Sequence, residues 1–186
     1  MRCFIAIFPP KEILDYLYDL ENELKKELPA KINWIAKSKL HITLKFLGQL
    51  DEKKINIIKE RLKIINFKKF CLSLEKIGLF PESNQSSISD KARVLWIGFD
   101  GENAVLELQK IIDQTLLDIF SNEQEFRTHM TLGRIKNIND KKKFFDILNN
   151  KDINKLKFDI NEFKVMKSIL RKDGPMYNVL EIYNLR

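Results

Sequence analysis

Residues 41–48, HITLKFLG, and residues 129–134, HMTLGR, hold the only two histidines of the 186-residue chain. In both stretches a threonine follows the histidine after one residue and a leucine comes next. The chain has only four threonines, so this placement after both histidines would arise by chance in about one chain in two thousand. A single His-x-Thr is most often an ordinary strand feature, but the repeated pattern indicates one site built from both stretches.

Both stretches are predicted strands, because they are rich in β-branched and aromatic residues and alternate in polarity. Side chains of a strand alternate between its faces, so His41 shares a face with Thr43, and His129 with Thr131. The intervening apolar residues point the other way, into packing. Each stretch therefore presents an imidazole and a hydroxyl on one face and core residues on the other.

Cationic residues flank both patterns. Lys45 is expected to continue the polar face of the first strand, and Arg127 that of the second. Arg134 falls out of phase with His129, and Gly133 would re-aim it by a bulge or by ending the strand.

Working outward, hydrophobic periodicity predicts an α+β fold with mainly antiparallel sheets. The predicted strands are 2–8, 32–36, 40–48, 70–80, 92–99, 126–135, 157–170 (one long strand or a bent pair) and 176–185. The predicted helices are 11–28, 51–65 with Asp51 as N-cap, 102–120 and 139–150. Residues 81–91 form a polar loop, and residues 82–90 are a candidate lid. The two histidine stretches look like related parts of two halves.

Composition favours a globular protein with an anionic partner. The chain is 44% hydrophobic and 32% charged, with a net charge of +7. Cys3 and Cys71 lie in apolar runs and are expected to be buried, without a disulfide or metal site. No apolar run reaches the length of a membrane span, so we expect a cytoplasmic protein with no membrane partner.

Two imidazoles can act as acid and base in one site, because histidine titrates near neutral pH. Displacement at phosphorus needs a base behind the attacking water and an acid at the leaving oxygen. The threonine hydroxyls would hold phosphate oxygens, and Arg134, Arg127 or Lys45 would add positive charge. The chain offers no ligand spacing typical of a zinc or two-metal site, so neither metal nor cofactor is expected.

The chain resembles the 2H phosphoesterases, and within them the RNA 2′,3′-cyclic phosphodiesterases, historically called 2′-5′ RNA ligases. The resemblance rests on residues 1–10 (MRCFIAIFPP), 32–50 (INWIAKSKLHITLKFLGQL), 92–99 (ARVLWIGF), 126–135 (FRTHMTLGRI) and 166–180 (MKSILRKDGPMYNVL). It implies a bilobal fold over residues 1–186, one domain of two pseudo-symmetric lobes. Two mainly antiparallel sheets, with helices packed outside, would enclose a central cleft.

The resemblance also implies metal-independent hydrolysis of RNA 2′,3′-cyclic phosphate ends to 2′-phosphomonoesters. His41 would be the proton donor and His129 the proton acceptor, with Thr43, Thr131 and Arg134 binding the substrate. The partner would be RNA with a cyclic phosphate end, with tRNA fragments one candidate, and the protein a monomer. Two alternatives stay open, namely 2′-5′ RNA ligation as the main activity and a non-catalytic RNA-binding module.

Aromatic residues near the motifs have two interpretations. Trp34, Phe46 and Tyr177 would either stack a nucleobase or pack in the protein, and Trp34 and Phe46 are expected in the core. Ser168 and Tyr177 are expected to serve strand packing and hydrogen bonding.

Overall fold

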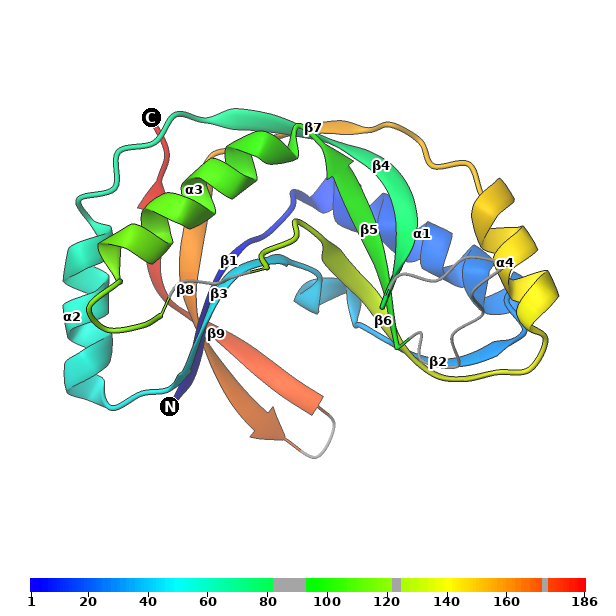
Figure 1. Ribbon diagram of the computed structural model, residues 1–186, viewed down its shortest axis with the longest axis horizontal. Helices are drawn as coiled ribbons and strands as arrows, with labels where there is room; N and C mark the ends of the chain where they lie inside the picture. Colours follow the sequence, from blue (N-terminus) through cyan, green and yellow to red (C-terminus); the bar gives the residue numbers. More distant parts are fainter. Residues whose placement is uncertain (82–92, 122–124, 172–173) are drawn as a thin grey trace.

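The computed structural model describes residues 1–81, 93–121, 125–171 and 174–186 (Figure 1). The elements are β1 (Arg2–Ile7), α1 (Lys11–Glu27), β2 (Ala30–Trp34), the 3-10 turn η1 (Lys37–Lys39), β3 (Ile42–Gln49), α2 (Glu52–Leu62), β4 (Phe70–Phe80), β5 (Val94–Asp100), α3 (Glu102–Thr115), β6 (Met130–Ile138), α4 (Lys141–Asn150), β7 (Lys157–Ile160), β8 (Glu162–Arg171) and β9 (Gly174–Asn184). They confirm the α+β class. The candidate lid at residues 82–90 lies outside the described residues.

The strands form two antiparallel halves joined at one point. One half has the order β3-β1-β8-β9, and the other has the order β7-β4-β5-β6, with β2 also paired to β6. The halves meet where β3 lies beside β6, through the single residue pair Ile42 and Met130. We expected two sheets, but this pair makes them one curled sheet (Figure 1). The run 157–170 is the bent pair, with β7 in one half and β8 in the other.

Two helices, α1 and α3, each follow a strand of one half and pack on the other half. α1 follows β1 of the first half but lies with α4 against the second half (Figure 1). α3 follows β5 of the second half but packs on β3 and on α2 of the first. Each half is therefore covered in part by a helix whose preceding strand belongs to the other half, which links the two halves together.

The predicted helix periodicity is confirmed in α1, where Ile13, Leu17, Leu20 and Leu24 are buried. Its apolar stripe faces the sheet because these positions recur every three or four residues.

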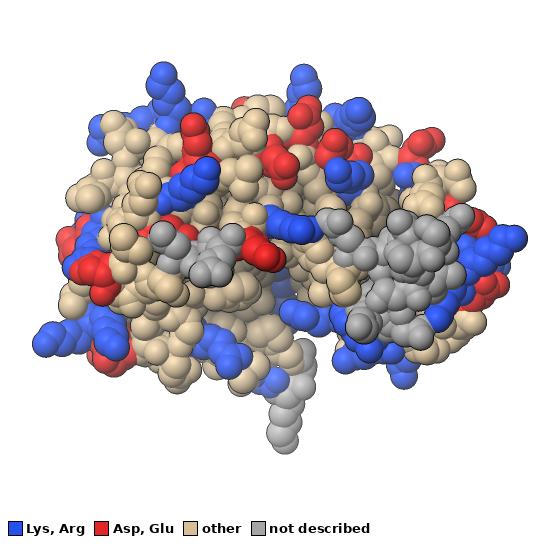
Figure 2. Space-filling view, viewed as in Figure 1, with Lys and Arg blue, Asp and Glu red and all other residues tan. Residues whose placement is uncertain are grey.

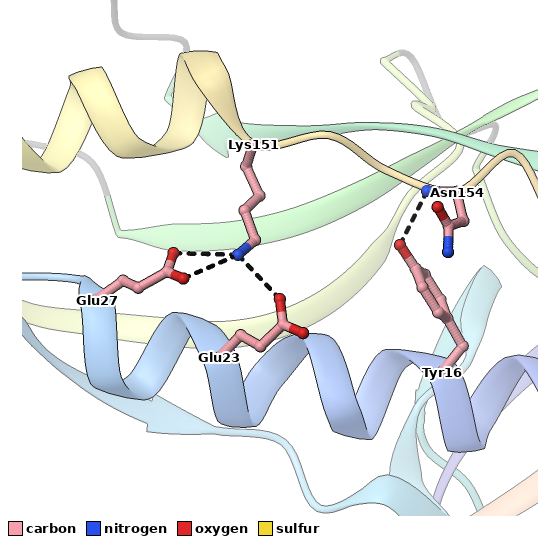
Figure 3. Close-up of polar contacts among 5 residues, drawn as sticks. All are labelled: Tyr16, Glu23, Glu27, Lys151 and Asn154. Carbon is pink, nitrogen blue, oxygen red and sulfur yellow. Dashed lines mark hydrogen bonds and ion pairs between the residues drawn. The ribbon is translucent and has the colours of Figure 1, made fainter.

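One flank of α1 contacts the segment at the end of α4 (Figure 3). There Lys151 Nζ lies 2.9 Å from a carboxylate oxygen of Glu23 and 3.1 Å from one of Glu27, and the Asn154 backbone N–H donates to the Tyr16 hydroxyl at 2.9 Å.

Asp51 caps α2 as predicted, accepting from the backbone N–H of Lys54 at 2.7 Å.

Most buried apolar side chains form one continuous cluster that includes residues from both halves. Cys3 is buried as expected, but the prediction for Cys71 is wrong, because this side chain is exposed. Cys71 is the second residue of β4, where the strand face alternation turns it outward while Leu72 enters the core.

Candidate active site

The two histidines stand at the junction of the two halves. His41 immediately precedes β3, and His129 immediately precedes β6. Their next residues, Ile42 and Met130, are the pair that joins the halves. Both histidines line one cleft of about 370 Å³, so the fold brings together two motifs that lie far apart in the sequence.

The structure places every predicted site residue around this cleft. Besides the histidines, its walls include Thr43, Thr131 and Arg134. Both threonines are half-buried, whereas Arg134 is exposed. The cleft thus contains two imidazoles, two hydroxyls and a guanidinium within one small volume.

The two imidazoles are held in the same way. His41 Nδ1 lies 2.6 Å from the carbonyl oxygen of Lys39, and His129 Nδ1 lies 2.8 Å from that of Arg127. A carbonyl oxygen only accepts, so each Nδ1 carries a hydrogen and donates it. In both rings Nε2 is then the nitrogen left to take up or release a proton.

Burial lowers the pKa of both His41 and His129, although the hydrogen bonds to the backbone carbonyls act in the opposite direction. The positive charge of a protonated His129 further lowers the pKa of His41. The cleft therefore disfavours protonation of both imidazoles at once. A bound anion would offset this effect, because a nearby negative charge favours imidazolium.

Both motif strands contain a bulge directly after the threonine. Ala6 pairs with Thr43 but Ile5 pairs with Lys45, so Leu44 is an extra residue on β3. The second half repeats this pattern on β6, where Trp96 pairs with Thr131 and Leu95 with Gly133.

The bulges reverse the alternation beyond them. Arg134 is therefore brought back to the face of Thr131, so of the two predicted alternatives, a bulge or the end of the strand, the bulge is present. The matching residue of the first half is Phe46, which is exposed and also lines the cleft. The expectation that Phe46 belongs to the core is wrong, because the bulge turns it outward.

The same bulge corrects the prediction for Lys45. Its side chain is buried, and Nζ pairs with Asp113 Oδ1 of α3 at 2.6 Å and donates to the Ser121 carbonyl at 3.1 Å. Although Lys45 forms part of the cleft wall, its ammonium binds inside the protein. In the second half the corresponding residue is Gly133, where a Cβ would lie only 2.6 Å from Ile32 Cγ2 on β2.

An aromatic wall around His41 was largely missed in the sequence. The ring centroids of Phe4, Phe8 and Tyr177 lie 5.0, 5.5 and 5.5 Å from that of His41. Phe4 and Phe8 were visible only as apolar residues of the first predicted strand and its end. Tyr177 was expected to serve packing, and it both packs on Phe4 and lines the cleft.

His129 has a comparable aromatic neighbour. The Phe80 ring meets it edge-on, with a centroid distance of 4.9 Å, and the Arg127 guanidinium carbon lies 5.8 Å from the Phe80 ring centroid. These rings provide the apolar surroundings that lower the pKa of the imidazole. Trp34, by contrast, is half-buried and packs against the core as expected.

Positive charge surrounds the cleft without dominating the surface. Lys39, Arg127 and Arg134 line it. Figure 2 shows lysine and arginine side chains near the hollow between the two halves, with acidic side chains mixed among basic ones elsewhere on this face. The cleft is therefore suited to an anion of limited size.

Within residues 1–81, 93–121, 125–171 and 174–186, no three or more His, Cys, Asp or Glu side chains are grouped to hold a metal ion. Over the same part of the chain, no helix combines the length and the apolar character needed to cross a membrane.

Comparisons with known proteins agree with this geometry. Residues 7–88 and 97–177 match the family described as LigT like Phosphoesterase. The RNA 2′,3′-cyclic phosphodiesterase of Methanocaldococcus jannaschii is 36% identical, over 97% of this chain and 99% of that protein. The protein of the same name from Archaeoglobus fulgidus is 29% identical, over 98% and 99%.

A solved structure shares the fold. Thermus thermophilus TT0787 superimposes with a TM-score of 0.76 and 23% identity, over 100% of this chain and 98% of that one. Together with the family match and the archaeal relatives, these observations establish that the chain belongs to the LigT-like phosphoesterase family.

Proposed function

We propose that this protein hydrolyses RNA 2′,3′-cyclic phosphate ends to 2′-phosphomonoesters by paired-histidine catalysis. One observation carries the proposal: His41 and His129 line the same cleft, and in both rings the Nδ1 hydrogen bond leaves Nε2 for proton transfer. The names of the archaeal relatives support RNA as the substrate, and so does the net charge of +7. We also propose that residues 1–186 form one domain of two lobes and that the protein acts as a monomer.

In the proposed reaction a water oxygen attacks phosphorus while the bond from phosphorus to O3′ breaks. His129 Nε2 accepts the proton of the water, and His41 Nε2 donates a proton to the departing O3′. Each transfer contributes about 10²- to 10⁴-fold to the rate. The 2′-phosphomonoester and a free 3′-hydroxyl result.

The non-bridging oxygens gain negative charge during the attack. Thr43 and Thr131 stand two residues after the proposed acid and base, and they would donate hydroxyl hydrogen bonds to these oxygens. Arg134 would add a charge-assisted contact. Chain residues thus supply the acid, the base and the hydrogen-bond donors of the proposed reaction, which uses no metal.

The direct test is an oligoribonucleotide that ends in a 2′,3′-cyclic phosphate, incubated with the protein in the presence of a metal chelator. We expect a 2′-phosphate end. His41→Ala and His129→Ala should each lose about 10²- to 10⁴-fold in kcat while remaining folded. Binding without turnover by the wild-type protein would instead favour the RNA-binding module.

A sulfur leaving group tests the assignment of the two roles. With sulfur in place of O3′, the leaving thiol has a pKa of about 8.5 and needs little protonation. His41→Ala should therefore regain most of its loss on this substrate, and His129→Ala should not. The reverse result would exchange the acid and the base.

A further inference from the structure

Lys39 is a cation of the cleft wall whose charge the protein leaves uncompensated. The residue is half-buried and lines the cleft from the turn η1. Among the residues that the structure describes, no carboxylate forms an ion pair with its ammonium, whereas Lys37 of the same turn pairs with Asp15. Opposite charges attract more strongly where little water separates them. The charge of Lys39 is therefore available to an anion bound in the cleft.

The structure fixes Lys39 relative to the proposed acid. Its carbonyl oxygen accepts the Nδ1 hydrogen of His41, so its backbone lies directly beside the imidazole. Its side chain reaches the β8–β9 hairpin, where a Cβ added to Gly174 would lie 3.6 Å from Nζ. This end of the hairpin projects beyond the other strands (Figure 1). Gly174 is three strand steps, or about 10 Å, along β9 from Tyr177, the residue whose ring meets His41 edge-on.

The reacting phosphate already has its donors in the proposed function. Thr43, Thr131 and Arg134 all line the cleft and would bind its non-bridging oxygens. Along the chain, Lys39 and Thr43 lie on opposite sides of His41. The ammonium of Lys39, held at the hairpin, is therefore suited to a second anionic group beyond the first histidine.

The covalent structure of an RNA end places such a group on this side. In a ribonucleotide C3′ is bonded to C4′, and C4′ carries the C5′ that leads to the phosphodiester of the preceding nucleotide. The base is attached at the other end of the ribose, at C1′ beside C2′. When O3′ departs toward His41, the preceding phosphodiester therefore lies on the His41 side of the sugar, where Lys39 lies.

We propose that Lys39 binds the phosphodiester that joins the terminal nucleotide to the preceding one. This inference rests on the proposed function and adds the substrate class. The cleft selects the end of an RNA chain over a cyclic mononucleotide, which has no such phosphodiester. Because an ammonium contacts a phosphate oxygen whatever the base, the selectivity concerns the presence of a chain and not its sequence.

The experiment changes one charge in the substrate and one in the protein. The substrates are two forms of the dinucleotide ApA with a 2′,3′-cyclic phosphate end, one joined by a phosphodiester and one by an uncharged methylphosphonate. The proteins are the wild type, Lys39→Met, Lys39→Arg and Lys37→Met. Lys37→Met is the matched control, because it removes the same charge from the same turn at a residue that does not line the cleft. The readout is the ratio of kcat/KM for the phosphodiester to kcat/KM for the methylphosphonate.

We expect the wild type to prefer the phosphodiester about 5- to 50-fold, the range of a hydrogen bond between charged groups that water partly screens. Lys39→Met should abolish this preference, mainly by raising KM for the phosphodiester. Lys39→Arg should keep most of it, because the charge remains, and Lys37→Met should keep all of it. The inference is overturned if the wild type has no preference or if Lys39→Met keeps the wild-type ratio. An equal loss on both substrates gives that second result and would place the ammonium on the cyclic phosphate instead.

Binding separates this inference from the proposed function. If the wild type turns over neither dinucleotide, the proposed function fails, and the same two dinucleotides serve as stable ligands in calorimetry. The wild type should then bind the phosphodiester more tightly than the methylphosphonate, and Lys39→Met should bind both alike. Equal discrimination by the wild type and Lys39→Met, or none by the wild type, would refute the contact.

Discussion

The buried ion pair behind the cleft gives a prediction with a calculable size. Lys45 and Asp113 join β3 to α3, with Nζ and Oδ1 at 2.6 Å and side chains only 2% and 6% exposed. We consider Lys45→Met, which keeps most of the apolar stem of the side chain but removes its charge. Because so little water reaches the pair, this variant removes a buried ammonium that compensates the Asp113 carboxylate.

Breaking a buried pair from one side costs about 3–5 kcal/mol in the free energy of unfolding. For a chain of this size, about 2–4 °C is lost per kcal/mol, so the melting temperature should fall by about 6–20 °C. The double variant with Asp113→Leu removes both charges of this ion pair and should recover most of the loss. Urea unfolding followed by tryptophan fluorescence compares both variants with the wild type.

Lys63→Met is the matched control, because Lys63 pairs with Glu60 at 2.6 Å on the surface, with side chains 53% and 70% exposed. Water screens such a pair, so this variant should unfold at the wild-type urea concentration. The reasoning is refuted if Lys45→Met is as stable as this control. A raised KM for the cyclic phosphate in that stable variant would show that the ammonium binds substrate instead.

Three other predictions concern the cleft. Because burial lowers the pKa of His41 and His129, the pH profile of kcat/KM should be bell-shaped with its optimum below pH 6.5. The pH profile of kcat should lie at higher pH, since the bound anion raises the pKa of both histidines. Coincident profiles would contradict this reasoning. Thr43→Ala or Thr131→Ala should lower kcat about 10- to 10³-fold, and serine at either position should restore most of it. Gly133→Ala should lower the free energy of unfolding, measured in urea, by about 1–3 kcal/mol, because the new Cβ would lie 2.6 Å from a methyl carbon on β2. A variant as stable as the wild type would mean that β2 shifts to accommodate the methyl group without cost.

The stability of the protein should also depend on the two imidazoles. A histidine whose pKa is lowered by folding binds fewer protons in the folded state than in the unfolded state. Its stabilising contribution is therefore complete above the unfolded value of about 6.5 and is lost as pH falls through the lower folded value.

Much of the site could be predicted from residue order alone. The repeated His-x-Thr-Leu pattern identified His41, Thr43, His129 and Thr131, because side-chain alternation in a strand is a local property. The main helices were equally predictable, since their apolar periodicity is contained in short windows, as the buried stripe of α1 confirms. Arg134 required one extra step, the bulge suggested by Gly133.

The bulge of the first half could not be predicted from the sequence. HITLKFLG alternates without a glycine near the extra residue, so Lys45 was assigned to the cleft face and Phe46 to the core, and both assignments were wrong. The bulge exists only in the pairing of β3 with β1, which depends on a strand about forty residues earlier in the chain.

The sequence by itself determined which residues could carry proton transfer, because residue type and local alternation decide that chemistry. Tertiary structure alone decided that Ile42 and Met130 pair, which sets both imidazoles in one cleft and makes one sheet of the two halves. It also decided that the ammonium of Lys45 binds Asp113 in the interior and that the ring of Phe46 faces the cleft. These outcomes depend on strand register and on contacts between distant segments, and no short window of sequence contains that information.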